Sequence, residues 1–226
     1  MKFTYYGHAC FEIETGGKKL LFDPFISPNP LAKEIDATKI SADFILVSHG
    51  HGDHVADVIE MAKRTKAQVI APFEVGSWFE GKGVENVHSM NHGGATKTDF
   101  GRVKLTAAIH SSSMPDGSYG GNPCGFVVET PEGNFYYSGD TALTYDMKLI
   151  GEATKLNFAI FPIGDFFTMG IDDALRAAEF VGATKIVGVH YDTFPPIKID
   201  HPAVLNAARA AGKTLLLPKI GETIEI

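Results

Sequence analysis

Short runs of apolar side chains, either alternating with polar ones or unbroken, recur through the first third of the chain and predict β-strands. The predicted strands are 2–6, 10–14, 19–23, 43–48 and 67–71. Between the last two, the apolar spacing changes to three and four residues, which predicts a helix over 55–66. Its apolar face holds Val55, Val58, Ile59 and Ala62. Strand, helix and strand in this order indicate a β–α–β unit.

The rest of the chain repeats this change from strands alone to strands alternating with helices. Predicted strands are 102–109, 124–130, 134–138, 157–163, 185–189, 214–217 and 223–226. Helical spacing predicts helices over 172–181 and 202–211. Two β-rich halves that each end in strand–helix alternation predict two sheets packed face to face with helices outside. We expect an α/β protein, a four-layer αββα sandwich, forming one domain across residues 1–226.

Composition and charge bear on function more than on fold. The 226 residues carry a formal net charge of −7 and no basic block, which disfavours a nucleic-acid partner. The start of the chain lacks the pattern of a signal peptide, and no apolar run is long enough to span a bilayer. We therefore expect a cytoplasmic protein that acts on a small molecule without a membrane partner, with a homo-oligomer left open. Cys10 and Cys124 are expected to be buried thiols rather than a disulfide.

Three of the nine histidines fall within six residues behind the predicted strand 43–48, in the sequence His49-Gly-His51-Gly-Asp53-His54. Two histidines two residues apart can bind one metal ion from a single loop, and the glycines let the backbone bend around it. Asp53 and His54 stand at the helix start and can face a second ion. Imidazole with carboxylate suits zinc, manganese or iron better than calcium. A chance cluster on a solvated loop is the alternative, which the buried strand before it disfavours.

Further candidate ligands stand singly at the ends of three later strands. They are His110, Asp140 and His190. Loops at strand ends are where α/β folds gather their functional residues. For any one of the three alone, a role as a hydrogen-bonding residue would be the better explanation. Together with the histidine cluster, they favour one shared metal site.

This order of residues, with Asp140 in "SGDT", resembles the metallo-β-lactamase superfamily over the whole chain. The stretches "GHACFEI" and "PIGDFFTMGIDDAL" are more narrowly similar to small metal-dependent hydrolases grouped near the ascorbate-phosphate lactonases. The resemblance implies the αββα fold and two divalent metal ions, Zn²⁺ first, with Mn²⁺ or Fe²⁺ as alternatives. It implies that His49, His51 and His110 hold one ion, that Asp53, His54 and His190 hold the other, and that Asp140 bridges both.

Other branches of the superfamily fit this sequence less well. Several lactamases have a cysteine where Asp140 stands, and flavo-diiron proteins usually have a glutamate in place of the second histidine. Glyoxalase II-like enzymes carry an additional helical C-terminal domain. RNA-processing relatives would need a basic exosite or an inserted domain. The resemblance therefore favours the hydrolases of small substrates.

The resemblance implies a reaction in which a hydroxide shared by the two ions attacks an ester, lactone or phosphodiester. Asp53 would also orient this nucleophile. His8 and Asp165, each following a predicted strand, are candidates to donate a proton or to support a ligand histidine. A packing role for His8 and a turn role for Asp165 stay open. The alternatives for the whole protein are a nuclease-like phosphodiesterase and a non-catalytic metal-binding or sensing protein.

The segment 111–125 is a candidate substrate-facing loop, because it follows His110 and is rich in serine and glycine, although it also fits a plain connection. Apolar residues near the ligand-bearing strand ends are candidates for a pocket wall. They are Phe166, Phe167, Met169, Tyr191 and Phe194. The remaining histidines are expected to lie outside the metal site. They are His88, His92 and His201.

Overall fold

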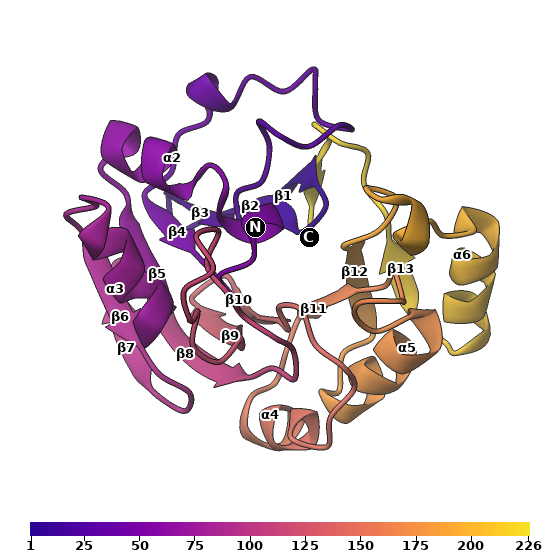
Figure 1. Ribbon diagram of the computed structural model, residues 1–226. Coiled ribbons are helices and arrows are strands. Elements are labelled where there is room, and N and C mark those ends of the chain that lie inside the picture. The colour runs from indigo at the N-terminus through magenta and orange to yellow at the C-terminus, as the bar shows by residue number, and fades with distance from the viewer.

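The computed structural model describes all residues 1–226, and its strands form two seven-stranded sheets packed face to face (Figure 1). In their order across the first sheet, the strands are β14 (Thr223–Glu225), β1 (Lys2–Gly7), β2 (Cys10–Thr15), β3 (Lys18–Phe22), β4 (Phe44–Leu46), β5 (Gln68–Pro72) and β6 (Val87–Met90). Across the second sheet they are β13 (Thr214–Leu216), β12 (Lys185–Val189), β11 (Phe158–Pro162), β10 (Gly133–Tyr137), β9 (Cys124–Thr130), β8 (Gly101–Ala107) and β7 (Ala95–Thr98).

Each sheet is antiparallel on one side and parallel on the other. In the first sheet, β1, β2 and β3 pair antiparallel, and β3 to β6 pair parallel. In the second sheet, β7 to β10 pair antiparallel, and β10 to β13 pair parallel. The carboxyl ends of parallel strands meet at one edge of a sheet, which is where α/β folds place their functional loops.

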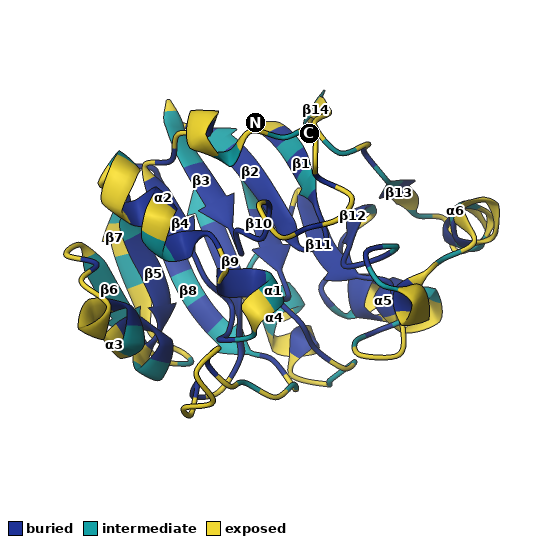
Figure 2. Cartoon of the chain, turned by 45° about the horizontal axis from the view of Figure 1, so that its top comes forward, coloured by how far each residue is buried: buried dark blue, intermediate teal, exposed yellow.

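Helices cover the outer faces of both sheets, so the predicted αββα sandwich is confirmed (Figure 1, Figure 2). The helices are α1 (Gly52–Val55), α2 (Val58–Thr65), α3 (Phe73–Gly81), α4 (Met147–Ala153), α5 (Ile171–Phe180) and α6 (His201–Ala210). Short 3₁₀ turns span Ala37–Lys39 and Pro195–Ile197. α3 packs on β5 and β6, α5 on β11, and α6 on β13. No helix is both long and apolar enough to cross a membrane.

The largest buried cluster lies between the two sheets and is rich in aromatic rings. Phe22 of the first sheet stacks on Phe11 at 4.6 Å between ring centroids and meets Phe126 of the second sheet edge-on at 6.0 Å. A second buried cluster fills the space between the first sheet and its helices. Cys10 and Cys124 are both buried and unpaired, as predicted. The sheets are therefore held by apolar packing, and their ends are left free to carry polar groups.

The helix predicted over 55–66 is divided into α1 and α2. The break falls at Asp57, whose amide donates to the Pro24 carbonyl at 3.1 Å instead of continuing the helix. The buried Asp57 carboxylate accepts from the amides of Ile26 and Ser27 at 2.6 and 3.0 Å. This tertiary pairing leaves α1 as a single turn that carries Asp53 and His54.

Four elements were not predicted from the apolar pattern. They are α3, β6, β7 and α4. The sequence of α3, FEVGSWFEG, mixes apolar residues and glycine without a clean helical stripe. β7 has the sequence ATKT and none of its residues is buried, because it is an edge strand. These elements depend on their neighbours, so their own residues carry little signal.

Candidate metal centre and active site

All seven predicted metal ligands lie together at one edge of the sandwich. His49 and His51 follow β4, and the single turn α1 presents Asp53 and His54. The others are His110 after β8, Asp140 after β10 and His190 after β12. Segments far apart in the sequence are thus brought to one place by the sheet ends.

The first group of three predicted ligands consists of histidines. The Nε2 atom of His49 lies 2.9 Å from the Nδ1 atom of His51. The ring of His110 stands 5.2 Å from each of the other two rings, centroid to centroid. One nitrogen from each of the three lies within 4.8 Å of one from each of the others. Such a group of imidazole nitrogens matches three protein ligands around one ion.

The second group combines a carboxylate with imidazoles. Ligand atoms of Asp53, His54 and His190, together with His8, lie within 4.8 Å of one another. Asp140 stands between the two groups. Its Oδ2 atom lies 3.0 Å from His190 Nε2, 3.2 Å from His54 Nε2 and 3.7 Å from His110 Nε2. This position is the one that a bridging carboxylate requires.

The buried polar atoms at the centre fit a bound cation. Asp140 Oδ1 is buried without a hydrogen-bond partner in the protein, and the buried His54 Nε2 faces only the other oxygen of the same carboxylate. An unpartnered buried polar atom is costly, and a metal ion between such atoms would satisfy them. Because nitrogen and carboxylate donors converge without competing lysine or arginine side chains, the donor set fits divalent zinc, manganese or iron.

Burial and charge set the protonation of the cluster. Burial lowers the pKa of His49 well below its usual value, and it also lowers the pKa of His51 and of His110. Burial alone would also lower the pKa of His54, but the carboxylates of Asp140 and Asp23 outweigh it and raise that pKa well above the usual value. Neutral imidazoles are the form that binds metal, and the His54 position is where the surrounding charge most favours a cation.

The two carboxylates of the cluster are held in their ionised form. Burial alone would raise the pKa of Asp140, but His190 and His54 lower it well below its usual value. Burial likewise would raise the pKa of Asp53, and the hydrogen bond from His8 together with the charge of His54 lowers it. Both side chains are therefore carboxylates at neutral pH.

His8 lies directly behind Asp53. Its Nε2 atom is 3.1 Å from Asp53 Oδ2, and its Nδ1 atom is 3.0 Å from the Thr193 hydroxyl. Its carbonyl accepts from the His190 amide at 2.7 Å. Burial, reinforced by His190, lowers the pKa of His8 to about 3. His8 is buried and fully neutral at physiological pH, so its geometry suits holding Asp53 in place.

His8 and His190 both adopt left-handed backbone conformations, with φ of 56° and 57°. Such conformations are uncommon for residues other than glycine and are maintained by surrounding contacts. The hydrogen bond between their backbones and the phenol of Tyr5, which donates to the His8 carbonyl at 2.9 Å, provide these contacts. The backbone around the second group is thus fixed.

Asp165 does not support a ligand histidine, contrary to one prediction. The residue is exposed, and its carboxylate makes no hydrogen bond to the histidine cluster. Left-handed φ values at Asp165 and Phe166, 59° and 57°, turn the side chain toward Gly170 at the start of α5. Asp165 therefore occupies the turn position that the sequence left open, and a catalytic role for it remains only a prediction.

Asp23, at the end of β3, is the residue that the sequence interpretation missed. It is fully buried, and its Oδ2 atom lies 3.0 Å from His54 Nδ1. The same carboxylate accepts from the amide and hydroxyl of Ser48 and from the phenol of Tyr137, each at 2.7 Å. Asp23 thus orients the His54 ring toward the centre. It follows an apolar strand just as Asp140 does, so the same rule could have found it.

A pocket of about 460 Å³ opens over the ligand cluster. Its lining residues are His51, Asp53, His110, Ser111, Asp140, Phe167, His190, Phe194 and Pro196. Of the predicted apolar wall, Phe167 and Phe194 line the pocket, whereas Met169 and Tyr191 are buried and Phe166 points into solvent. The pocket is therefore ionic at its base and aromatic at its rim.

The loop after His110 contacts the ligand loop directly. The Ser111 hydroxyl reaches the pocket and lies 3.5 Å from His51 Nε2. The Ser112 hydroxyl accepts from the Gly50 amide at 3.1 Å and donates to the Gly120 carbonyl at 2.8 Å. The segment 111–125 thus borders the pocket and fixes the bend between the first two histidines.

The other three histidines lie outside the cluster, as expected. His92 Nε2 is 2.8 Å from the Pro123 carbonyl, and His201 Nε2 is 2.7 Å from Asp192. His88 belongs to β6 and contributes to no potential metal group.

A family model described as a beta-lactamase superfamily domain matches residues 18–191. This range includes strands of both sheets and all seven predicted ligands. The fold and the site together define a protein of the beta-lactamase superfamily.

Relatives that match the full length of this chain identify its family within the superfamily. A UPF0173 metal-dependent hydrolase of Flavobacterium johnsoniae is 53% identical over 226 residues and covers 100% of both chains. Another, from Christiangramia forsetii, is 50% identical over 227 residues with the same coverage. The chain belongs to the UPF0173 metal-dependent hydrolases, and the prediction of a hydrolytic enzyme is confirmed.

Solved structures share the fold of this chain. Igni18, a metallo hydrolase of Ignicoccus hospitalis, is 33% identical and superposes with a TM-score of 0.88, covering 100% of this chain and 98% of that one. An isothiocyanate hydrolase from Delia radicum gut bacteria shares the fold with a TM-score of 0.79 at 18% identity, over 100% and 99% of the two chains.

Proposed function

We propose that this chain binds two divalent metal ions, zinc first among them, and hydrolyses an uncharged carboxylic ester or lactone with an apolar portion. The observation that carries the proposal is the position of Asp140, with Oδ2 between His190, His54 and His110 at 3.0 to 3.7 Å. A carboxylate in this position can contribute a ligand to an ion in each of the two groups at once.

Each ion would have its own three ligands besides Asp140. His49, His51 and His110 would hold the first ion. Asp53, His54 and His190 would hold the second. Bound there, the ions would act as Lewis acids and supply a water of lowered pKa. Manganese and iron accept the same donors, so the choice among these metals depends on their supply.

The protein's own groups would place the attacking water and keep it reactive. His8 holds one carboxylate oxygen of Asp53 at 3.1 Å, which leaves the other oxygen for the second ion and for a water bound there. Asp23 and the Ser48 hydroxyl hold the outer nitrogens of His54 and His49 at 3.0 and 2.9 Å. Fixed ligand rings reduce the reorganisation that the reaction would otherwise need.

The lining of the pocket supports an uncharged substrate. None of its residues is lysine or arginine, so the protein itself offers no side-chain clamp for a phosphate. The rim instead presents Phe167, Phe194 and Pro196, which suit an aliphatic or aromatic group. A phosphodiester is therefore the less favoured of the bond classes that the sequence left open.

The proposal is tested by assaying zinc- and manganese-loaded protein against matched substrates. The panel comprises p-nitrophenyl hexanoate, a hexanoic lactone, a thioester and bis(p-nitrophenyl) phosphate. We expect turnover of the ester or lactone, loss of turnover in Asp140→Ala, and unchanged turnover in Asp99→Ala, whose carboxylate is exposed on the surface. Turnover of the phosphodiester alone would contradict the substrate class, and turnover that survives Asp140→Ala would contradict the two-metal site.

A further inference from the structure

The turn that follows β12 carries a buried hydroxyl between a predicted ligand and a residue of the pocket wall. His190 is the predicted ligand, Phe194 lines the pocket, and Thr193 between them is 6% exposed. Left-handed backbone at His190 and Asp192, with φ of 57° and 63°, bends the chain sharply here. The Thr193 hydroxyl therefore lies against the ring of His8 and does not line the pocket.

Hydrogen bonds from other segments hold this turn in place. The Asp192 carboxylate accepts from the Ile199 amide at 3.0 Å and lies 2.7 Å from His201 Nε2. Within the turn, the Thr193 amide donates to the Tyr191 carbonyl at 2.8 Å. Left-handed residues other than glycine persist only where such contacts determine them. The place of the Thr193 side chain is thus fixed by the backbone that carries it.

The ring of His8 needs a hydrogen-bond donor at Nδ1. Its Nε2 atom lies 3.1 Å from the Asp53 carboxylate, which in its ionised form only accepts, so Nε2 must carry a hydrogen. The ring is buried, and its centroid lies 4.0 Å from that of His190, so a second proton on it is disfavoured. A neutral imidazole has one N–H group, which leaves Nδ1 as an acceptor.

The Thr193 hydroxyl supplies this donor. Its Oγ1 atom lies 3.0 Å from His8 Nδ1. The other acceptor within reach, the Tyr191 carbonyl, is 3.3 Å away and already accepts from the Thr193 amide. If the hydroxyl donated to Tyr191 instead, the hydrogen of His8 would have to stand on Nδ1. A lone pair on Nε2 would then face the Asp53 carboxylate, so the charge of Asp53 favours donation from Thr193 to His8.

We propose that Thr193 is a positioning residue, whose hydroxyl donates to His8 Nδ1 and so holds His8 with its hydrogen on Nε2, directed at Asp53. The hydrogen bonds run in one direction, from Thr193 through His8 to the carboxylate that would face the second ion. Because Thr193 does not line the pocket, it acts through His8 alone. Its effect on turnover rests on the proposed hydrolysis, whereas the tautomer of His8 can be measured without any turnover.

The test is nitrogen-15 NMR of zinc-loaded protein with labelled histidines, in which the His8 signals are those missing from His8→Ala. We expect a hydrogen on Nε2 of His8 and none on Nδ1. Thr193→Val keeps the shape but removes the hydroxyl, so the Nδ1 signal should shift toward that of a nitrogen without a hydrogen-bond donor. Thr193→Ser keeps the hydroxyl and should leave the signal where it is. A hydrogen on Nδ1 in the parent, or an unshifted Nδ1 signal in Thr193→Val, would overturn the proposal.

Hydrolysis of p-nitrophenyl hexanoate gives the second measurement. Thr193→Val should lower kcat about fivefold with KM little changed, the size expected of one neutral hydrogen bond. In the His8→Ala background the same substitution should lower kcat no further, because its effect passes through His8. A loss in Thr193→Ser as large as in Thr193→Val would overturn the proposal, since packing alone would then explain it.

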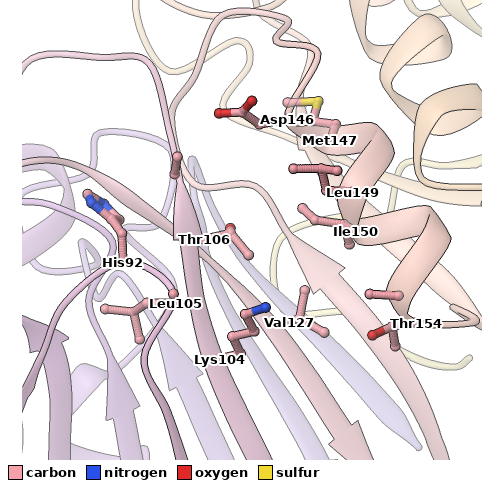
Figure 3. Close-up of a pocket in the computed structure, with 13 residues that line it drawn as sticks. His92, Lys104, Leu105, Thr106, Val127, Asp146, Met147, Leu149, Ile150 and Thr154 are labelled. Carbon is pink, nitrogen blue, oxygen red and sulfur yellow. The ribbon is translucent and has the colours of Figure 1, made fainter.

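Thr154→Val is the matched control. Thr154 directly follows α4 and lines a separate cavity of about 310 Å³ between α4 and the second sheet (Figure 3). This cavity shares no lining residue with the pocket over the metal ligands. The control should match the parent in kcat and in the His8 signals. The expected His8 signals without any turnover would support the role of Thr193 and contradict only the proposed hydrolysis.

Discussion

At the scale of single residues, the centre depends on the side chains that hold the ligands as well as on the ligands. Asp23 contacts one nitrogen of His54, and the other nitrogen faces Asp140. His49 is held similarly: its Nδ1 atom lies 2.9 Å from the Ser48 hydroxyl, which leaves Nε2 toward the cluster. With one ring nitrogen held from behind, the tautomer and the direction of the other nitrogen are both determined.

Asp23→Asn tests this arrangement. The substitution keeps the shape but weakens the acceptor behind His54, so we expect zinc affinity to fall about 10- to 100-fold. Competition with a coloured chelator measures the change. Tyr137→Phe is the matched control, since it also removes a hydrogen bond to Asp23 but leaves the contact with His54. Equal losses of affinity in the two variants would show that Asp23 acts only through stability.

A second residue-scale prediction concerns His8. His8→Ala removes the hydrogen bond to Asp53, and we expect kcat to fall about tenfold with KM little changed, the size typical of a lost supporting contact. His8→Gln carries an amide that can still donate to Asp53, so it should recover part of the activity. A glutamine variant no better than the alanine variant would contradict the positioning role. Circular dichroism of both variants checks that they fold.

The gathering of the seven predicted ligands at one edge could be foreseen, because their spacing is unusual and each lies at or shortly after the end of an apolar strand. Asp23 follows an apolar strand too and could have been found by the same rule, but its contact with His54, a residue of another segment, is not visible in the local sequence. The proposed role of Asp165 depended on where its side chain points. That direction is set by two successive left-handed residues, Asp165 and Phe166. Neither is a glycine, which would have indicated a turn in the sequence.

At the scale of elements, α3 and the loop after His110 are joined at the protein surface. The indole of Trp78 on α3 donates to Asp116 at 2.7 Å, and Lys82 lies 3.4 Å from the same carboxylate. In the same loop, two residues before Asp116, Met114 is buried in the core cluster between the first sheet and its helices. These contacts determine where Ser111 and Ser112 meet the ligand loop.

Trp78→Phe removes the indole donor and keeps the aromatic ring. We expect faster amide hydrogen exchange in 111–120 and a higher KM, because Ser111 at the pocket wall is held less firmly. Phe73→Ala is the control, since Phe73 lies on the same helix, is 56% exposed and does not contact Asp116. Exchange that rises equally in both variants would contradict the role of the Trp78–Asp116 contact.

The main elements could be predicted because an unbroken or regularly spaced apolar run in a globular chain nearly always marks a buried strand or helix face. The division of α1 from α2 could not, because it depends on the Asp57 carboxylate pairing with the amides of Ile26 and Ser27, which lie 31 and 30 residues earlier. β7 and α3 could not be predicted either. Edge strands and short covering helices are stabilised by packing against their neighbours rather than by their own apolar pattern.

At the scale of the whole molecule, the two halves each pass from antiparallel to parallel pairing and contribute predicted ligands to one edge. His49, His51, Asp53 and His54 belong to the first half, and His110, Asp140 and His190 to the second. The centre is therefore complete only when the two sheets are packed together. Folding and metal binding should be coupled.

The buried histidines predict how the stability of the protein depends on pH once metal is removed with a chelator. The pKa of His8 falls from 6.5 to about 3 on folding, and the pKa values of His49, His51 and His110 are also lowered. Below about pH 6.5 the unfolded chain takes up these protons and the folded chain does not, so stability is lost as pH falls toward 3. The raised pKa of His54 acts only above 6.5, with the opposite sign.

Urea denaturation at pH 7 and pH 5 measures this effect. We expect the stripped protein to be less stable at pH 5 by about 1.4 kcal/mol per pH unit for each net proton excluded. His8→Gln should reduce the dependence, because one buried histidine no longer titrates. Equal or greater stability at pH 5 would contradict the burial of neutral imidazoles.

The most direct measurement of the central claim is anomalous X-ray diffraction at the zinc edge from crystals of zinc-loaded protein. The proposed centre predicts two peaks flanking Asp140, one among His49, His51 and His110 and one among Asp53, His54 and His190. In Asp140→Ala at least one of them should lose occupancy. A single peak, or peaks away from these residues, would contradict the two-metal site.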